Sequence, residues 1–135
     1  MKFKYKNFGK NIWKPVIPVV LRNGNQEIEY NVLLDSGADM CLGHAEVGKA
    51  IGIAVTSGEK YEFGGITGPG IAYKHYLEIE IGGYKIPDIE FSFSADLPLN
   101  YSFGVLGHKG FFEHFKVIFE TSKKLVELKP IKQQL

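Results

Sequence analysis

The segment from Val32 to Asp39 holds the residues best able to do chemistry. It reads Val-Leu-Leu-Asp-Ser-Gly-Ala-Asp, so an apolar run leads directly into the carboxylate of Asp35. Buried strands do not normally end on an aspartate unless another group satisfies its charge. Ser36 adds a hydroxyl that can hydrogen-bond to a neighbouring loop, and Gly37 allows a ligand or a partner chain to approach the backbone closely. The segment therefore predicts a functional carboxylate at the end of a buried strand.

A simple strand-terminating turn is the alternative interpretation, because Asp, Ser and Gly are all turn residues. From average residue usage, Asp-(Ser or Thr)-Gly-Ala should arise by chance in fewer than about one in a hundred chains of this length. The Leu-Leu pair in front of it makes a chance occurrence rarer still.

Two further segments could contribute to a site. Between Gly64 and Gly70, four glycines in seven residues surround the apolar Ile66. Such a tip can move and can bring its backbone against a ligand, although glycine-rich hairpin loops often have no function. The segment from Phe103 to His108 is an apolar strand that ends on Gly107, a pattern that taken alone is more typical of core packing.

The rest of the sequence predicts an all-β domain that would position these segments. Its 16 glycines separate short runs rich in Val, Ile, Tyr and Phe, a pattern typical of strands and tight turns. Three hairpins are expected, joining 16–21 to 26–34 around Asn23-Gly24, 71–81 to 85–93 around Gly82-Gly83, and 115–119 to 125–128. Two short helices are expected over 44–51, ended by Gly52, and over one or two turns of 108–114.

Composition excludes several classes of protein. The chain has 135 residues, which fits one domain, with 44% hydrophobic and 23% charged residues and a net charge of +1. We expect neither nucleic acid nor a membrane as a partner, because no long basic run and no apolar span is present. The basic stretch from Lys2 to Lys14 could bind an anion, but it more closely fits an arm or edge strand.

The single cysteine, Cys41, excludes an intramolecular disulfide. Together with the absence of a signal-peptide pattern, it leads us to expect a cytoplasmic protein. The four histidines are scattered and no Cys or carboxylate cluster completes a metal site, so no metal and no cofactor are expected.

The order and spacing of the three segments resemble the retropepsin-like aspartic proteases, which include the retroviral proteases. The resemblance rests on Leu33–Asp39, on Gly64–Gly68 and on Val105–Gly107, and it extends over nearly the whole chain. It implies an all-β, single-lobe acid-protease β-barrel with one or two short helices and a glycine-rich flap hairpin. The domain would span 16–130, with 1–15 as an N-terminal arm or edge strand and 131–135 as a C-terminal tail.

The resemblance also implies an activity and an assembly. In this family each subunit of a homodimer gives one aspartate, so Asp35 would meet Asp35 of a second chain and activate a water that hydrolyses a peptide or an unfolded protein. The catalytic residues would then be Asp35, Ser36 and Gly37. The substrate-binding residues would be Ala38, Asp39, Leu42, Gly64, Gly65, Ile66, Thr67, Gly68, Phe103 and Val105.

One departure from the retroviral pattern keeps other functions open. Retroviral members carry an arginine after the late glycine, paired with the carboxylate that Asp39 matches, whereas this chain has His108. Such a pairing would depend on pH, since histidine titrates near neutrality. The alternatives are a catalytically silent retropepsin-fold module for dimerisation or peptide binding, and a domain that works only when it is fused or docked to another protein.

Overall fold

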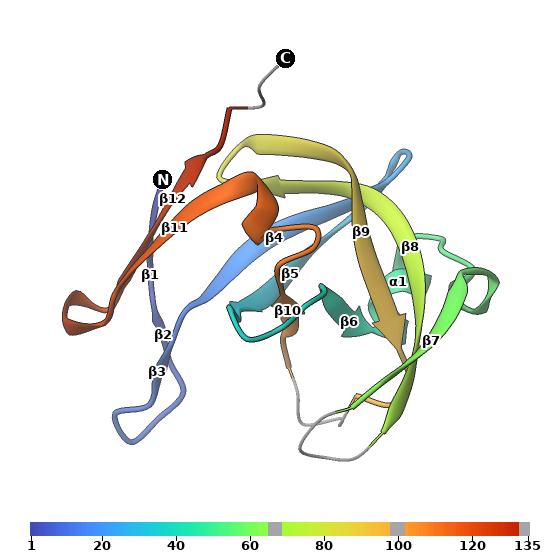
Figure 1. The fold of residues 1–135 in the computed structure, drawn as a ribbon, viewed down its shortest axis with the longest axis horizontal. Coiled ribbons are helices and arrows are strands. Elements are labelled where there is room, and N and C mark those ends of the chain that lie inside the picture. Colours follow the sequence, from blue (N-terminus) through green and yellow to red (C-terminus); the bar gives the residue numbers. More distant parts are fainter. Residues whose placement is uncertain (65–68, 98–101, 133–135) are drawn as a thin grey trace.

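The computed structural model describes residues 1–64, 69–97 and 102–132. Its main feature is a seven-stranded sheet in which β4 also pairs with β8, so six of the strands close into a barrel (Figure 1). In spatial order the strands are β4 (Val16–Asn23), β5 (Gln26–Leu34), β10 (Gly104–Leu106), β6 (Leu42–His44), β9 (Tyr84–Ser94), β8 (Gly70–Ile81) and β7 (Glu59–Phe63). The chain therefore has the all-β, single-barrel architecture that its sequence predicts.

Two of the predicted hairpins form the long walls of the barrel. β4 and β5 pair from Val16↔Leu33 to Asn23↔Gln26, so the connection is only Gly24-Asn25, two residues shorter than the sequence suggests. Gly24 has a φ of +61°, which suits glycine because it lacks a Cβ. β8 and β9 are joined by Gly82-Gly83, with φ values of +56° and +85°, a combination that matches the right-handed twist of a hairpin.

The helices are short, as expected. The helix α1 (Ala45–Ala50) is capped by His44, whose Nδ1 accepts a hydrogen bond from the backbone N–H of Glu46 at 3.1 Å. It is followed by Gly52 at a φ of +79°, a common way to end a helix. The second predicted helix is a single 3₁₀ turn, η2 (Phe112–His114), and two more such turns are η1 (Val55–Ser57) and η3 (Thr121–Lys123).

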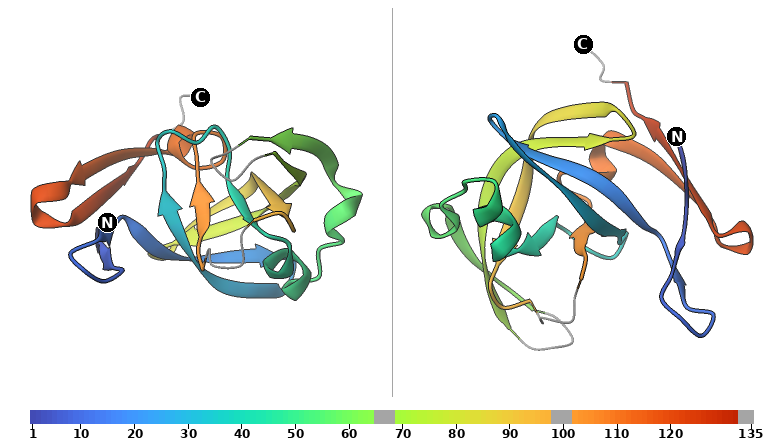
Figure 2. Two further views of the ribbon diagram at one scale, coloured as in Figure 1. Left: turned by 90° about the horizontal axis from the view of Figure 1, so that it is seen from below. Right: turned by 180° about the vertical axis from the view of Figure 1, so that it is seen from behind.

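A three-stranded sheet projects from one side of the barrel (Figures 1 and 2). Its order is β1 (Lys2–Lys4), β12 (Leu125–Pro130) and β11 (Phe115–Glu120), so the start of the chain pairs with its end. Between this sheet and the barrel lies a small hairpin, β2 (Lys6–Asn7) with β3 (Trp13–Lys14), which we call the N-terminal hairpin.

Aromatic and branched side chains fill the barrel. Phe91, Phe93 and Phe111 are fully buried, and a buried phenylalanine contributes about 1.5–3 kcal/mol relative to an exposed one. Three polar residues of β9 are buried with them: Glu90, Ser92 and Ser94. Ser94 has a defined partner, because its hydroxyl donates to the carbonyl of Ile71 at 2.5 Å. Within the described residues no helix is long and apolar enough to cross a membrane.

Candidate active site

Asp35 lies at the carboxyl end of β5, where the chain turns away from the sheet. Its backbone N–H donates to the carbonyl of Leu106 at 3.0 Å, and its own carbonyl accepts from the N–H of Ala38 at 3.0 Å. The side-chain Oδ1 accepts from the N–H of Gly37 at 2.9 Å. These three bonds fix the position of the aspartate, and the residue as a whole stays partly exposed.

The loop that carries Asp35 crosses over the end of β10. β10 lies between β5 and β6, parallel to the first and antiparallel to the second. Beyond β10, the N–H groups of His108 and Lys109 donate to the carbonyls of Ala38 and Asp39, both at 2.9 Å. The loop that carries Asp35, which we call the site loop, is therefore hydrogen-bonded at Ala38 and Asp39 to the segment that follows β10.

Gly107 makes this crossing possible. A Cβ at this position would lie 2.5 Å from the carbonyl oxygen of Met40 and 2.6 Å from that of Ala38. Real Cβ atoms do not approach backbone oxygens that closely. The loop that carries Asp35 can therefore pass this close to the segment after β10 only because position 107 is glycine. The lack of space for a Cβ therefore explains why a glycine follows the apolar Val105-Leu106 pair.

His108 does not take the role that the retroviral pattern suggests. Its Nε2 donates to the carbonyl of Ser36 at 2.6 Å, and its ring packs on Phe112 with the ring centroids 5.2 Å apart. Among the described residues, His108 and Asp39 do not form an ion pair. The imidazole instead hydrogen-bonds to the backbone of the loop that carries Asp35, and Ser36 stays exposed.

The predicted substrate-binding residues are spread over several elements. Leu42 and Val105 are paired neighbours on β6 and β10 and are partly buried. Gly64 is exposed just beyond β7, at the base of the predicted flap. The four residues at the flap tip, Gly65, Ile66, Thr67 and Gly68, lie outside the described residues. Their role, like that of Asp39, stays a prediction.

The described residues at the base of the predicted flap contact neighbouring segments of the barrel. The carboxylate of Asp96 accepts a hydrogen bond from the backbone N–H of Ile71 at 2.8 Å, which links the start of β8 to the segment after β9. Phe63 closes over the opposite strand, because a Cβ on Gly70 would lie 2.5 Å from its ring.

Comparison with known proteins bears on the fold. No protein-family model and no curated protein matches the sequence. A retropepsin-like aspartic protease from Rickettsia conorii superposes on 93% of this chain and 95% of its own, with a TM-score of 0.67 and 16% identity. The retroviral protease-like domain of Ddi1 from Leishmania major superposes on 87% and 90%, with a TM-score of 0.55 and 15% identity. The chain has a retropepsin-like fold.

A third structure, EIAV protease in complex with the inhibitor HBY-793, superposes on 76% of this chain and 88% of its own at 20% identity. Its TM-score of 0.48 is too low to add to the argument. The first two superpositions therefore establish the retropepsin-like fold.

Cys41 lies directly beneath the site loop but cannot supply a nucleophile there. Its thiol is buried, and burial raises its pKa to about 12, so it stays protonated at neutral pH. Its Sγ accepts from the N–H of Gly107 and donates to the carbonyl of Lys109, both at 3.4 Å. The thiol therefore joins the site loop to the segment after β10 as a packed, weakly hydrogen-bonding group.

The histidines are used in local structure. Besides His44 and His108, His75 contacts the carbonyl of Val55 through Nε2 at 2.7 Å, and His114 lies 3.4 Å from the Glu113 carboxylate. No group of three or more His, Cys, Asp or Glu side chains in the described part of the chain could hold a metal ion.

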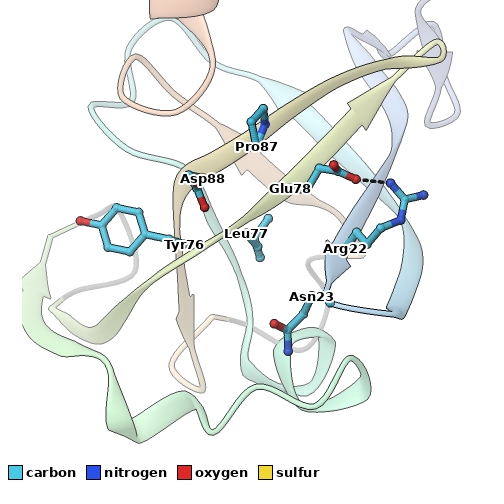
Figure 3. Close-up of a pocket in the computed structure, with 8 residues that line it drawn as sticks. Arg22, Asn23, Tyr76, Leu77, Glu78, Pro87 and Asp88 are labelled. Carbon is cyan, nitrogen blue, oxygen red and sulfur yellow. Dashed lines mark hydrogen bonds and ion pairs between the residues drawn. The ribbon is translucent and has the colours of Figure 1, made fainter.

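The barrel also carries a pocket at its opposite end, remote from Asp35. It has a volume of about 370 Å³ and lies beside the Gly24 turn, between Arg22, Tyr76 and Asp88 (Figure 3). Arg22 pairs there with Glu27, Glu78 and Glu80, and these carboxylates raise its pKa, the bond to Glu78 contributing most. Its guanidinium is therefore already neutralised, and the pocket shares no residue with the Asp35 loop.

No pattern in the sequence indicates that the N-terminal hairpin packs against Phe103. Phe103, predicted to line a substrate pocket, is only 8% exposed, and the ring of Phe8 packs edge-on against it with centroids 5.5 Å apart. The one available signal was the alternation of lysines with Phe3, Tyr5, Phe8 and Trp13, which indicates an arm that packs but not where it packs.

Proposed function

We propose that this chain is one subunit of an aspartic endopeptidase whose active site forms when two copies bring their Asp35 carboxylates together. The observation that carries the proposal is the setting of Asp35 itself. Hydrogen bonds to Leu106, Ala38 and Gly37 fix this aspartate at the end of a buried strand, and the residue remains partly exposed. A carboxylate held this way is positioned for reaction before substrate arrives.

The sequence supports the need for a second copy. Asp-Ser-Gly occurs once in the chain, whereas activation of water by shared-proton carboxylates requires two aspartates. An isologous dimer brings the same residue of both copies to a two-fold axis. Each Asp35 loop also presents the exposed Ser36 hydroxyl, which can hydrogen-bond to the loop of the other copy.

The chemistry at such a pair is general acid–base catalysis. Two carboxylates in contact cannot both ionise cheaply, so they share one proton. The ionised partner takes a proton from a water, the water attacks the scissile carbonyl, and the protonated partner donates to the reacting group. Gly37, Ala38 and Asp39 would hold the main chain of a peptide or unfolded protein, and the flap would close over it and exclude water.

A silent module for dimerisation or peptide binding is the second candidate. It is favoured by His108, which braces the carbonyl of Ser36 and is not paired with Asp39. Against it stands the intact Asp-Ser-Gly-Ala-Asp segment, since a carboxylate pair is costly to keep in a site that does no chemistry.

Sedimentation and cleavage measured over the same range of protein concentration test the proposal. We expect the rate of cleavage per mole of chain to rise with concentration in step with the dimer fraction, because a monomer holds half of the catalytic pair. Full activity per mole at concentrations where only monomer sediments would contradict a shared site. A stable dimer that cleaves no unfolded protein between about pH 4 and 8, where a carboxylate pair can share a proton, would favour the silent module.

A further inference from the structure

The face of the barrel next to Asp35 can be identified from strand alternation. Leu34 and Leu106 are buried in the core, so their neighbours Leu33 and Val105 point to the opposite face of the sheet. Val105 pairs with Leu33, and Asp35 and Phe103 lie two residues from this pair. The same outer face therefore carries Asp35 at one end and Phe103 at the other.

The N-terminal hairpin reaches this face from the neighbouring strand. Val16 pairs with Leu33, and the N–H of Leu34 donates to the carbonyl of Pro15 at 3.0 Å. Lys14, the last residue of β3, is thus level with Asp35 along the sheet and two residues from Val16, on the same side.

The N-terminal hairpin packs on this outer face at Phe103. Val16 is 1% exposed and Phe103 is 8% exposed, although neither belongs to the core cluster inside the barrel. The ring of Phe8 packs edge-on against Phe103 with centroids 5.5 Å apart. Phe8 itself is 40% exposed, so it forms the outer surface of a small apolar wall built on Phe103.

Lys14 adds a positive charge to this wall. Its Nζ lies 5.6 Å from the centre of the Phe8 ring and 5.5 Å from that of Phe103. Both distances are within the range of cation–π attraction, which holds an ammonium in place without neutralising it. Within 1–64, 69–97 and 102–132, the ion pairs of the chain involve other lysines, namely Lys49, Lys109 and Lys123. The charge of Lys14 remains available to an incoming carboxylate.

We propose that the N-terminal hairpin determines substrate specificity. Phe8 and Lys14 form a wall beside Phe103, and the Lys14 ammonium selects peptides in which the side chain that lies against this wall is acidic. This inference rests on the proposed function, since it takes the peptide to lie along the face that carries Asp35. The hairpin is thus part of the substrate site, in addition to its place in the fold.

The test compares matched peptides. The sites at which the enzyme cuts an unfolded protein are mapped first, and one of them supplies the sequence of a parent peptide. Glu, Gln or Lys is then placed at each position that flanks the cleaved bond. We expect kcat/KM to favour Glu over Gln by about fivefold at one position, the size of a single partly exposed ion pair. In Lys14→Gln this preference should disappear, and in Lys14→Glu it should turn toward Lys.

Phe8 and Lys124 supply the second variant and the matched control. Phe8→Ala removes the outer ring and should weaken the Glu preference, because the ammonium loses one of its two aromatic contacts. Lys124 makes a similar contact from the turn between β11 and β12, with its Nζ 5.2 Å from the centre of the Trp13 ring. Lys124→Gln should keep the wild-type preference. Thermal unfolding of each variant checks that the hairpin remains folded.

The outcomes separate this inference from the proposed function. Cleavage with equal kcat/KM for Glu and Gln peptides at every position overturns the inference and leaves the protease standing. If nothing is cleaved, a synthetic peptide pool equilibrated with the Asp35→Asn chain provides the readout. Enrichment of acidic peptides that is lost with Lys14→Gln supports the hairpin as a binding wall. No enrichment overturns it. A loss of dimer with Lys14→Gln, without a change in preference, also overturns it and assigns Lys14 to subunit contact.

Discussion

Replacing Asp35 by asparagine should lower kcat/KM for an unfolded protein substrate by at least about 10³-fold, in the range expected for loss of a general acid–base group. Asparagine has nearly the same shape and its Oδ1 can still accept the hydrogen bond from Gly37, which keeps the loop in place. It cannot take a proton from water, so the pair loses its base. The measurement is peptide release from wild type and variant at several pH values, with thermal unfolding to confirm that the fold is retained.

Asp88→Asn is the matched control for this substitution. Asp88 is exposed beside the pocket at the opposite end of the barrel, with a φ of +52°, a conformation that asparagine adopts readily. Its replacement should leave cleavage unchanged. Retained cleavage in Asp35→Asn, or an equal loss in Asp88→Asn, would show that the carboxylate of Asp35 is not the catalytic base.

Replacing Gly107 by alanine should destabilise the fold by about 1–3 kcal/mol, the usual cost of forcing a methyl group into a close-packed contact. The added Cβ would meet the backbone oxygens of Ala38 and Met40 at 2.6 and 2.5 Å. Backbone atoms cannot rotate away as a side chain can, so the loop carrying Asp35 must move away from the segment after β10. Urea unfolding followed by circular dichroism measures the loss, and cleavage should fall with it because the same loop carries the carboxylate.

Gly64→Ala is the control for stability. Among the described residues, no heavy atom would lie within 4 Å of a Cβ at Gly64, and Gly64 lies in a loop at the base of the predicted flap, so we expect no steric cost from alanine. Its free energy of unfolding should therefore stay close to that of wild type. If Gly107→Ala were equally stable, the crossing of the site loop over β10 would be looser than the hydrogen bonds of Ala38 and Asp39 indicate.

The barrel could be predicted because its signals are local. Gly24 and the Gly82-Gly83 pair mark turns whose positive φ angles favour glycine, and the alternation on either side of them gives the strands of the two long hairpins. His44 and Gly52 mark the ends of α1 in the same way. The position of Asp35 at the end of a buried strand also followed from its own neighbours in sequence.

What could not be predicted depends on residues far apart in the chain. The contact between Phe8 and Phe103 joins positions 95 residues apart, and the carbonyl that His108 contacts belongs to Ser36, 72 residues away. Neither pair follows a period or a motif, so only the closed barrel reveals it. The same holds for Gly107, whose steric role becomes visible once Ala38 and Met40 are placed beside it.

Mixing wild-type chain with the Asp35→Asn chain tests most directly whether two copies share one active site. If subunits exchange freely in an isologous dimer, about a quarter of the dimers in an equimolar mixture carry both aspartates. We predict about a quarter of the cleavage rate of wild type at the same total concentration. A rate of about half or more would mean that a chain with its own Asp35 works without the aspartate of a partner, and would contradict the shared carboxylate pair.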